Sequence, residues 1–381
     1  MRIYRIVAVA LLSAMALTAQ RRELTINAET PEGQVLQQIG QEADAAKKAA
    51  LMEEFAQKYP KHDGAAWVLE QLLAHHLKTP DFDKALSAGE RLLALDPDDT
   101  ATSHSCLKAA EGKKDPDLIA KWAANTSKLA RKAAAEPEPK DAEEKEDWKK
   151  GVDYAKQVDT YTEYSLYANV LATQDPAKKI MLAEALEKQN PQSQYMSQVN
   201  DQRFLALRQS GQNDKAVELA EKVLEKEQTN EDMLLVVADK YMNAKTQPDK
   251  VIALSNKLVE VMGARQKPEG VSEDDWNKRK NLMMGLGHWM AGMTFLGQKK
   301  TKEMDTSLRA ALPFIEGNAQ LAAPALFQLG LANYQMGAAT KNKKLLADAL
   351  AFNRKCAAIK SQYSAQAAKN AQVITQQFGI K

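Results

Sequence analysis

The sequence predicts an all-α protein built from stacked helical hairpins, and three observations support this. Ala, Leu, Lys, Glu and Gln, which are strong helix formers, dominate the 381 residues. Apolar residues recur at spacings of three and four, and no long Val/Ile/Thr-rich alternation indicates a strand. Units of roughly 34 residues repeat a plan of helix, break, helix and stop. Because one hairpin cannot bury its own apolar stripe, we expect the units to stack as a solenoid.

The clearest unit spans residues 66–99. Its first helix places Leu69, Leu72 and Leu73 on one stripe. A break at residues 79–81 separates it from a second helix of the same kind, which stops at residues 96–97 because proline cannot continue a helix.

This unit resembles a tetratricopeptide repeat. The resemblance rests on Ala85, on Pro97 and on the start of the second helix at residues 81–85. The unit departs from the family pattern at four positions, namely Leu73, His76, Gly89 and Leu92. The resemblance implies a right-handed α-α superhelix of about eight hairpins.

Further hairpins are expected along the rest of the chain, some with long helices. The expected hairpins lie at residues 29–65, 100–134, 197–230, 231–265 and 323–360. A long helix is expected at residues 142–172, paired with a helix at 176–189, and another from 272 to about 296. A capping helix is expected at residues 364–378. Interruptions at 136–140 and 266–271 divide the chain into three predicted blocks, residues 23–135, 141–265 and 272–381.

Residues 1–19 read as a secretory signal peptide. Arg2 and Arg5 form a basic start, and residues 6–19 are mostly apolar or small. Fourteen helical residues reach only about 21 Å, short of a roughly 30 Å bilayer core, so a permanent anchor is the weaker alternative. Cleavage is expected after Ala16 or Ala19, and no nearby Cys supports lipid attachment. We therefore expect a periplasmic or secreted bacterial protein whose mature chain is not stably inserted in a membrane.

The charge balance argues against nucleic acid as the partner. The chain has 52 basic and 50 acidic residues, and removing residues 1–19 takes away two Arg and no acid. The mature chain is then neutral, without the concentrated basic surface that nucleic acid requires. The only cysteines, Cys106 and Cys356, fall in different repeats, so two free, buried thiols are favoured over a disulfide.

No motif indicates catalysis, a metal or a cofactor. The five histidines form no HExxH or zinc spacing, and adjacent His75 and His76 point about 100° apart on a helix. Residues 285–287 lack the third glycine of a dinucleotide loop, and no GxSxG occurs. Four methionines allow a copper site, but packing is the favoured interpretation of these residues, which are Met283, Met284, Met290 and Met293.

The resemblance implies a non-catalytic scaffold that holds a protein or peptide in its concave groove. The predicted export indicates a role in envelope assembly or maintenance. Two alternatives stay open: a cell-wall or glycan-acting enzyme built on helical repeats, and an outer-membrane accessory or solute-binding protein. In the family, groove side chains come from the first helix of each hairpin. The corresponding residues here are Trp67, Glu70, His104, Lys108, Tyr161, Tyr164, Asp201, Arg208, Asp239, Trp289, Met293, Phe327 and Tyr334.

Two interpretations of the aromatic residues in this set are possible. In the first, they only pack against neighbouring first helices. In the second, Tyr161, Tyr164, Trp289 and Tyr334 stay partly exposed in the groove, where aromatic side chains and a nearby Arg208 are typical of binding hot spots.

Overall fold

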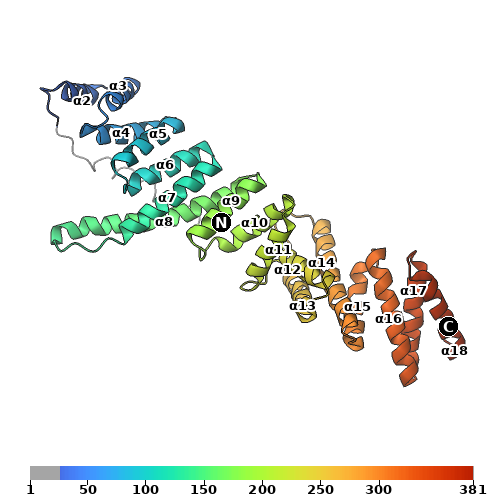
Figure 1. The fold of residues 1–381 in the computed structure, drawn as a ribbon. Helices are drawn as coiled ribbons and strands as arrows, with labels where there is room; N and C mark the ends of the chain where they lie inside the picture. Colours follow the sequence, from blue (N-terminus) through green and yellow to red (C-terminus); the bar gives the residue numbers. More distant parts are fainter. Residues whose placement is uncertain (1–25, 381) are drawn as a thin grey trace. The chain divides into compact units, whose positions relative to one another are not determined.

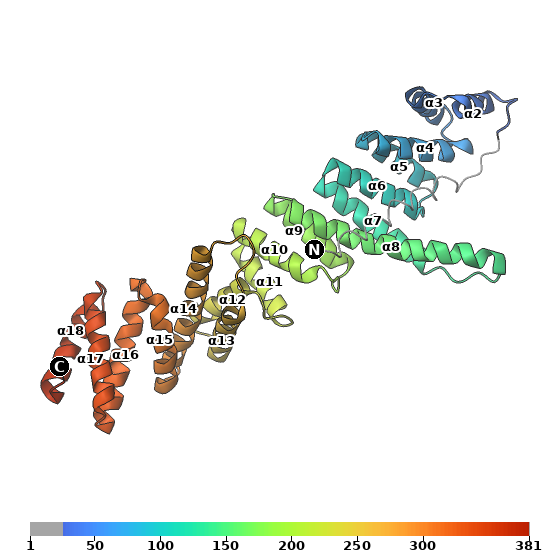
Figure 2. The same ribbon diagram turned by 180° about the vertical axis from the view of Figure 1, so that it is seen from behind.

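A computed structural model describes residues 26–380, and every regular element in that range is an α-helix. The chain divides into two compact units, residues 1–210 and 211–381. The predicted signal peptide at residues 1–19 lies outside the described residues. The all-α repeat fold predicted from the sequence is confirmed, because consecutive helices pair as hairpins through short connections (Figure 1, and from behind Figure 2).

Unit 1 holds nine of the described helices. They are α2 (Pro31–Gln41), α3 (Ala45–Lys58), α4 (Gly64–Lys78), α5 (Phe82–Leu95), α6 (Thr100–Lys113), α7 (Pro116–Ala134), α8 (Ala142–Ala172), α9 (Pro176–Gln189) and α10 (Met196–Gln209). The first helices of successive hairpins form one layer, because α4 packs on α6, α6 on α8 and α8 on α10. In the layer of second helices, α7 packs on α9.

Unit 2 holds the other eight. They are α11 (Asn213–Leu224), α12 (Glu231–Asn243), α13 (Pro248–Ala264), α14 (Glu273–Gly297), α15 (Thr301–Ile315), α16 (Ala319–Thr340), α17 (Lys343–Ala358) and α18 (Ser364–Phe378). The helices α12, α14, α16 and α18 pack on one another in sequence. The predicted capping helix at residues 364–378 is α18, which closes the series.

Helix ends follow the capping signals of the sequence. The Asp141 side chain accepts a hydrogen bond from the Glu143 N–H at the start of α8, and Ser272 accepts one from Asp275 at the start of α14. Gly211 has a φ of 73°, the left-handed conformation that a helix end often requires. The division between the units falls at this glycine.

The predicted interruptions at residues 136–140 and 266–271 are non-helical, and each lies inside a unit. The apolar packing continues across both of them, because α7 packs closely on α8 and α13 on α14. A break in helical sequence therefore lengthens a connection here without separating two cores.

Each unit buries its own apolar side chains. In unit 1 one cluster extends from Leu36 of α2 to Val199 of α10. In unit 2 one cluster extends from Met304 of α15 to Ala367 of α18. Cys106 and Cys356 are free and buried, as predicted. Burial raises the pKa of Cys106 to about 12 and that of Cys356 to about 11, which keeps both thiols protonated near neutral pH.

Glycines allow helices to approach closely at several positions. A Cβ on Gly89 of α5 would lie 2.2 Å from the Cys106 sulfur of α6, and one on Gly292 of α14 would lie 2.6 Å from a Leu308 methyl carbon of α15. The departure of Gly89 from the family pattern therefore has a physical cause, since no larger side chain fits beside Cys106.

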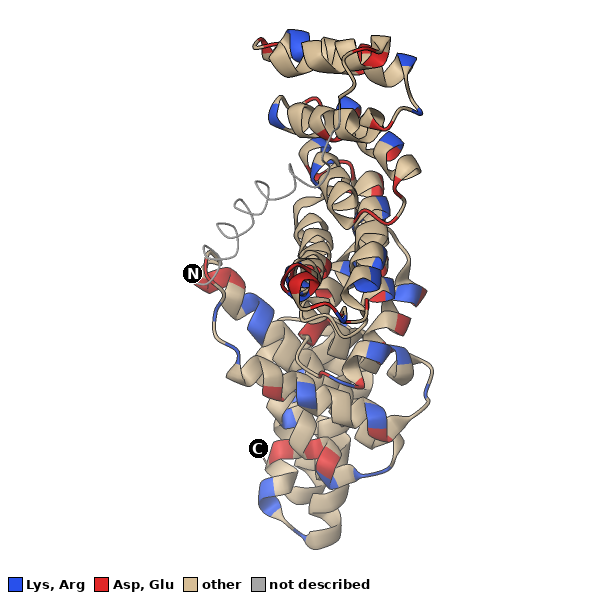
Figure 3. Cartoon of the chain, turned by 90° about the vertical axis from the view of Figure 1, so that its left-hand side faces the viewer, with Lys and Arg blue, Asp and Glu red and all other residues tan. Residues whose placement is uncertain are grey.

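Charged residues of both signs are spread over the helices (Figure 3). Many form ion pairs between neighbouring helices, such as Lys121 with Glu90 at 2.8 Å and Lys355 with Glu316 at 2.9 Å. Within residues 26–380, no helix is both long enough and apolar enough to cross a membrane.

Candidate functional site: an aromatic strip in unit 1

Helix α8 carries four tyrosines at spacings of seven, three and three residues, which places them in a band along one side of the helix. These four are Tyr154, Tyr161, Tyr164 and Tyr167. The short connection between α9 and α10 adds Tyr195, and α6 adds His104. We call these six residues the aromatic strip.

The rings of the strip form an unbroken series of contacts. The His104 ring centroid lies 6.3 Å from that of Tyr154 and 5.1 Å from that of Tyr161. Tyr164 follows at 6.4 Å from both Tyr161 and Tyr167. Tyr195 lies 6.2 Å from Tyr164 and stacks on Tyr167, with centroids 4.6 Å apart and planes 12° from parallel. Such tilted and stacked pairs add stability beyond the area they bury.

Hydrogen bonds hold the polar ends of several rings. The Tyr161 hydroxyl donates to Oε2 of Glu111 at 2.7 Å, and the Ser165 hydroxyl donates to the other carboxylate oxygen. The Tyr167 hydroxyl donates to Gln198. Burial, together with the Glu111 charge, raises the pKa of Tyr161 far above its ordinary value of 10, so this hydroxyl remains a donor.

At the inner end of the strip lies a buried neutral imidazole. His104 is 5% exposed, and its Nδ1 lies 3.2 Å from the Tyr154 hydroxyl. Burial, with a smaller contribution from the charge of Lys108, lowers the pKa of His104 to about 3. Burial also lowers the pKa of Lys108, while Glu111 opposes that change. The Nε2 atom of His104 is buried without a hydrogen-bond partner among the described residues.

Exposure increases towards Tyr164. Its side chain is 44% exposed, whereas Tyr154, Tyr161, Tyr167 and Tyr195 are partly buried. An exposed ring held by rigid neighbours loses little conformational entropy when a partner covers it. The strip is therefore a preorganised apolar surface with polar edges.

The structure brings together only part of the groove set predicted for unit 1. His104, Tyr161 and Tyr164 lie in one series of ring contacts. Trp67 packs partly buried against the core of the unit, as Tyr161 does, but it is not part of the series of ring contacts described above. Glu70 and Asp201 are partly buried on α4 and α10. Arg208 is exposed on α10, and no ion pair or cation–π contact joins it to the strip among the described residues.

Sequence reasoning missed three members of the strip. Tyr154 and Tyr167 could have been found from their spacing to Tyr161 and Tyr164. Tyr195 precedes α10, and no helical periodicity marks it. Its stacking on Tyr167 depends on how α8 and the segment before α10 meet in space.

The residues predicted for the groove in unit 2 make different contacts. Asp239 is exposed on α12. The Trp289 indole N–H donates to the Leu321 carbonyl at 3.1 Å, and both Trp289 and Met293 pack against the core. Phe327 packs against the core as well, with its ring 5.1 Å from that of Tyr363.

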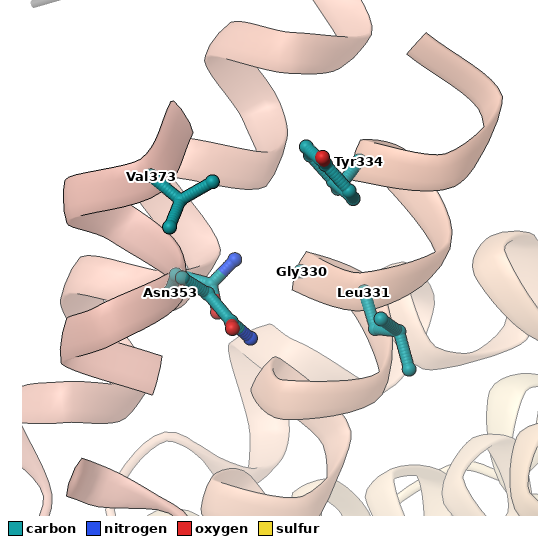
Figure 4. Close-up of a pocket in the computed structure, with 6 residues that line it drawn as sticks. Gly330, Leu331, Tyr334, Asn353 and Val373 are labelled. Atoms are coloured by element: carbon teal, nitrogen blue, oxygen red, sulfur yellow. The ribbon is translucent and has the colours of Figure 1, made fainter. Parts of the chain in front are cut away.

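Tyr334 lines a small cavity between α16, α17 and α18 (Figure 4). The cavity volume is about 110 Å³, and Gly330, Asn353 and Val373 also line it. The Tyr334 hydroxyl donates to Gln377 at 3.3 Å. Drug-sized ligands occupy pockets of roughly 300–1,000 Å³, so this cavity is too small for such a ligand.

No group of three or more His, Cys, Asp or Glu side chains in residues 26–380 is placed to hold a metal ion. The methionines of α14 are divided between buried and partly buried positions, with Met283 and Met290 5% and 2% exposed. Met290 and Met283 therefore belong to the packed interior, as the packing interpretation predicts.

No protein-family description and no curated protein matches the chain. Among solved structures, it is similar to the TPR domain of P58(IPK), with 12% identity and a TM-score of 0.25 over 91% of this chain and 99% of that one. It is also similar to yeast Tom70, with 12% identity and a TM-score of 0.22 over 96% of this chain and 77% of that one. A third similar structure is the Cut9–Hcn1 hetero-tetramer of APC/C, with 10% identity and a TM-score of 0.20 over 97% of this chain and 82% of that one.

Proposed function

We propose that this chain is a non-catalytic scaffold that binds a protein or peptide partner along the aromatic strip of unit 1. The observation that supports the proposal most strongly is the unbroken series of six rings around Tyr164, whose side chain is 44% exposed. Tyrosine is enriched at binding hot spots because it combines a large rigid apolar face with a hydrogen-bonding edge.

The hydrogen bonds of the strip favour recognition through ring faces. Glu111 and Gln198 already accept from the hydroxyls of Tyr161 and Tyr167. A partner therefore meets apolar ring surface first and polar atoms at the margin. This arrangement suits an extended or helical segment carrying apolar side chains.

Site-specific photo-cross-linking tests this proposal in the producing cells. A photoreactive benzoylphenylalanine at Tyr164 is expected to capture one or a few discrete proteins. The same residue at Lys188, which is exposed on α9, is the matched control and is expected to capture none of them. Identical products from both positions, or no product from Tyr164, would contradict the proposal.

The captured partner then allows a quantitative test. Tyr164→Ala is expected to weaken its binding by more than about 1 kcal/mol, roughly fivefold, because the ring supplies much of the exposed apolar surface. The helical circular dichroism signal should not change. An affinity equal to that of the unaltered protein would show that the partner binds elsewhere.

We further propose that the scaffold acts outside the cytoplasm, in the assembly or maintenance of the cell envelope. The basic and apolar character of residues 1–19 supports export. Cell fractionation with N-terminal sequencing should find the mature chain outside the cytoplasm, beginning near Leu17 or Gln20. A cytosolic chain that begins at Met1 would exclude this part of the proposal.

A further inference from the structure

A concave surface of unit 1 lies between α5 and α7, which are second helices of their hairpins. It is an open groove of about 620 Å³. The aromatic strip, in contrast, belongs to α6, α8 and the segment before α10. Helix α7 packs closely on α9, whereas α5 and α7 make few or no close backbone contacts, and this wider separation leaves the groove open.

The lining of the groove is mainly apolar. Leu93 and Ala94 from the last turn of α5 form one side, together with Pro97 just beyond the helix. Trp122 and Ala124 of α7 form the other side. Ala94, Pro97 and Ala124 are exposed, so apolar surface faces solvent on both sides of the groove.

Ion pairs stand near both ends of this apolar surface. Lys121 of α7 pairs with Glu90 of α5 at 2.8 Å, and its ammonium lies 4.8 Å from the centre of the Trp122 ring. Lys132 of α7 pairs with Asp98 at 2.5 Å. Both pairs join α7 to α5 or to the residues that follow it.

Between these pairs, Lys128 has no acidic partner. It lies seven residues after Lys121, and the residue seven positions after Glu90 is Pro97. Lys128 and Pro97 both line the groove, so the Lys128 side chain borders its apolar surface. Among the described residues, Lys128 forms no ion pair.

We propose that the α5–α7 groove binds a segment of a partner protein in which an Asp or Glu side chain lies close to an apolar side chain. The carboxylate pairs with Lys128, which borders the groove. The apolar side chain covers the surface formed by Leu93, Ala94 and Ala124. One unpaired cation on an apolar surface suits a single carboxylate with an adjoining apolar group, and not a polyanion.

A peptide array tests the proposal with the full chain. Each ten-residue peptide contains a single Asp or Glu and one Leu, Ile, Val or Phe that lies one to four residues from it. Each peptide is paired with a twin in which Asn replaces the Asp or Gln replaces the Glu. The best peptides are then measured by fluorescence anisotropy. Acidic peptides are expected to bind at least about tenfold more tightly than their twins, which corresponds to the loss of one charge-assisted contact.

Two variants locate the binding. Lys128→Gln should abolish the preference for acid over amide, whereas Lys188→Gln, on α9, should retain it. Ala94→Trp should abolish binding of both members of each pair by filling the groove, and it should not affect folding because Ala94 is exposed. An array without binders, equal binding of twins, or a preference that persists in Lys128→Gln would overturn the proposal.

The test is independent of the aromatic strip. Tyr164→Ala is expected to leave peptide binding at the α5–α7 groove unchanged, because Tyr164 belongs to α8 and does not line the groove. Loss of array binding in Tyr164→Ala, with binding retained in Ala94→Trp, would assign the peptides to the strip instead.

Discussion

The first helices of hairpins carry aromatic residues in both units, but these residues make different contacts. On α8 in unit 1, the tyrosines contact one another in series and Tyr164 stays 44% exposed. On α14 and α16 in unit 2, Trp289 and Phe327 pack against neighbouring helices. Aromatic residues on first helices therefore serve as core or as surface, depending on what neighbouring elements place over them.

The largest expected effect on stability in this comparison comes from truncating Trp289 of unit 2. Trp289→Ala removes apolar packing and the hydrogen bond to the Leu321 carbonyl. We expect it to destabilise unit 2 by about 3 kcal/mol, near the lower end for such truncations because the ring is only partly buried. Hydrogen exchange with mass spectrometry, read separately for each unit, measures the change. A loss below about 1 kcal/mol would mean that Trp289 is a surface residue like Tyr164.

A core substitution in unit 1 measures how much stability that unit loses when its packing is disturbed. Ala85 is fully buried, within the main cluster of that unit. Ala85→Leu should overpack this site and cost about 1–3 kcal/mol. The exposed Ala94 of the same helix provides the control, since Ala94→Leu should change stability by less than about 0.5 kcal/mol. An unchanged melting temperature for Ala85→Leu would contradict the assigned packing.

The buried imidazole of the strip predicts a dependence of stability on pH. The folded pKa of His104, about 3, lies below its ordinary value of 6.5, so the unfolded chain binds the proton more readily. The associated stability is complete above pH 6.5 and declines as the pH falls towards 3, by at most about 1.4 kcal/mol per pH unit. Urea unfolding between pH 7 and 5 should show a smaller decline in His104→Gln than in the unaltered protein. Equal declines would show that His104 does not titrate on unfolding.

The smallest expected effect on stability belongs to the exposed ring of unit 1. Tyr164→Ala should lower the free energy of unfolding by about 1 kcal/mol, because it loses three tilted ring contacts although much of its ring already faces water. Chemical denaturation of Tyr164→Ala and of Trp289→Ala under the same conditions measures the two losses in the free energy of unfolding. Comparable losses for the two variants would remove the distinction between the aromatic residues of the two units.

Part of the candidate site was predictable from the sequence. His104, Tyr161 and Tyr164 occupy family positions on first helices, and these three do contact one another. Arg208 was expected near the tyrosines, but it forms no ion pair or cation–π contact with them. The position of Arg208 relative to the tyrosines depends on how α10 packs on α8, and periodicity within each helix carries no information about this packing.

The sequence by itself determined the class of fold and the limits of several helices. The predicted helices at residues 142–172, 176–189 and 364–378 coincide with α8, α9 and α18, because capping residues, prolines and apolar spacing act within a few residues of the backbone they affect. Only the tertiary structure decided that the chain divides at Gly211, that Tyr195 stacks on Tyr167, and that α5 and α7 leave a groove beside Lys128. These features depend on distances between helices, which are set by the combined volumes of side chains far apart in the sequence.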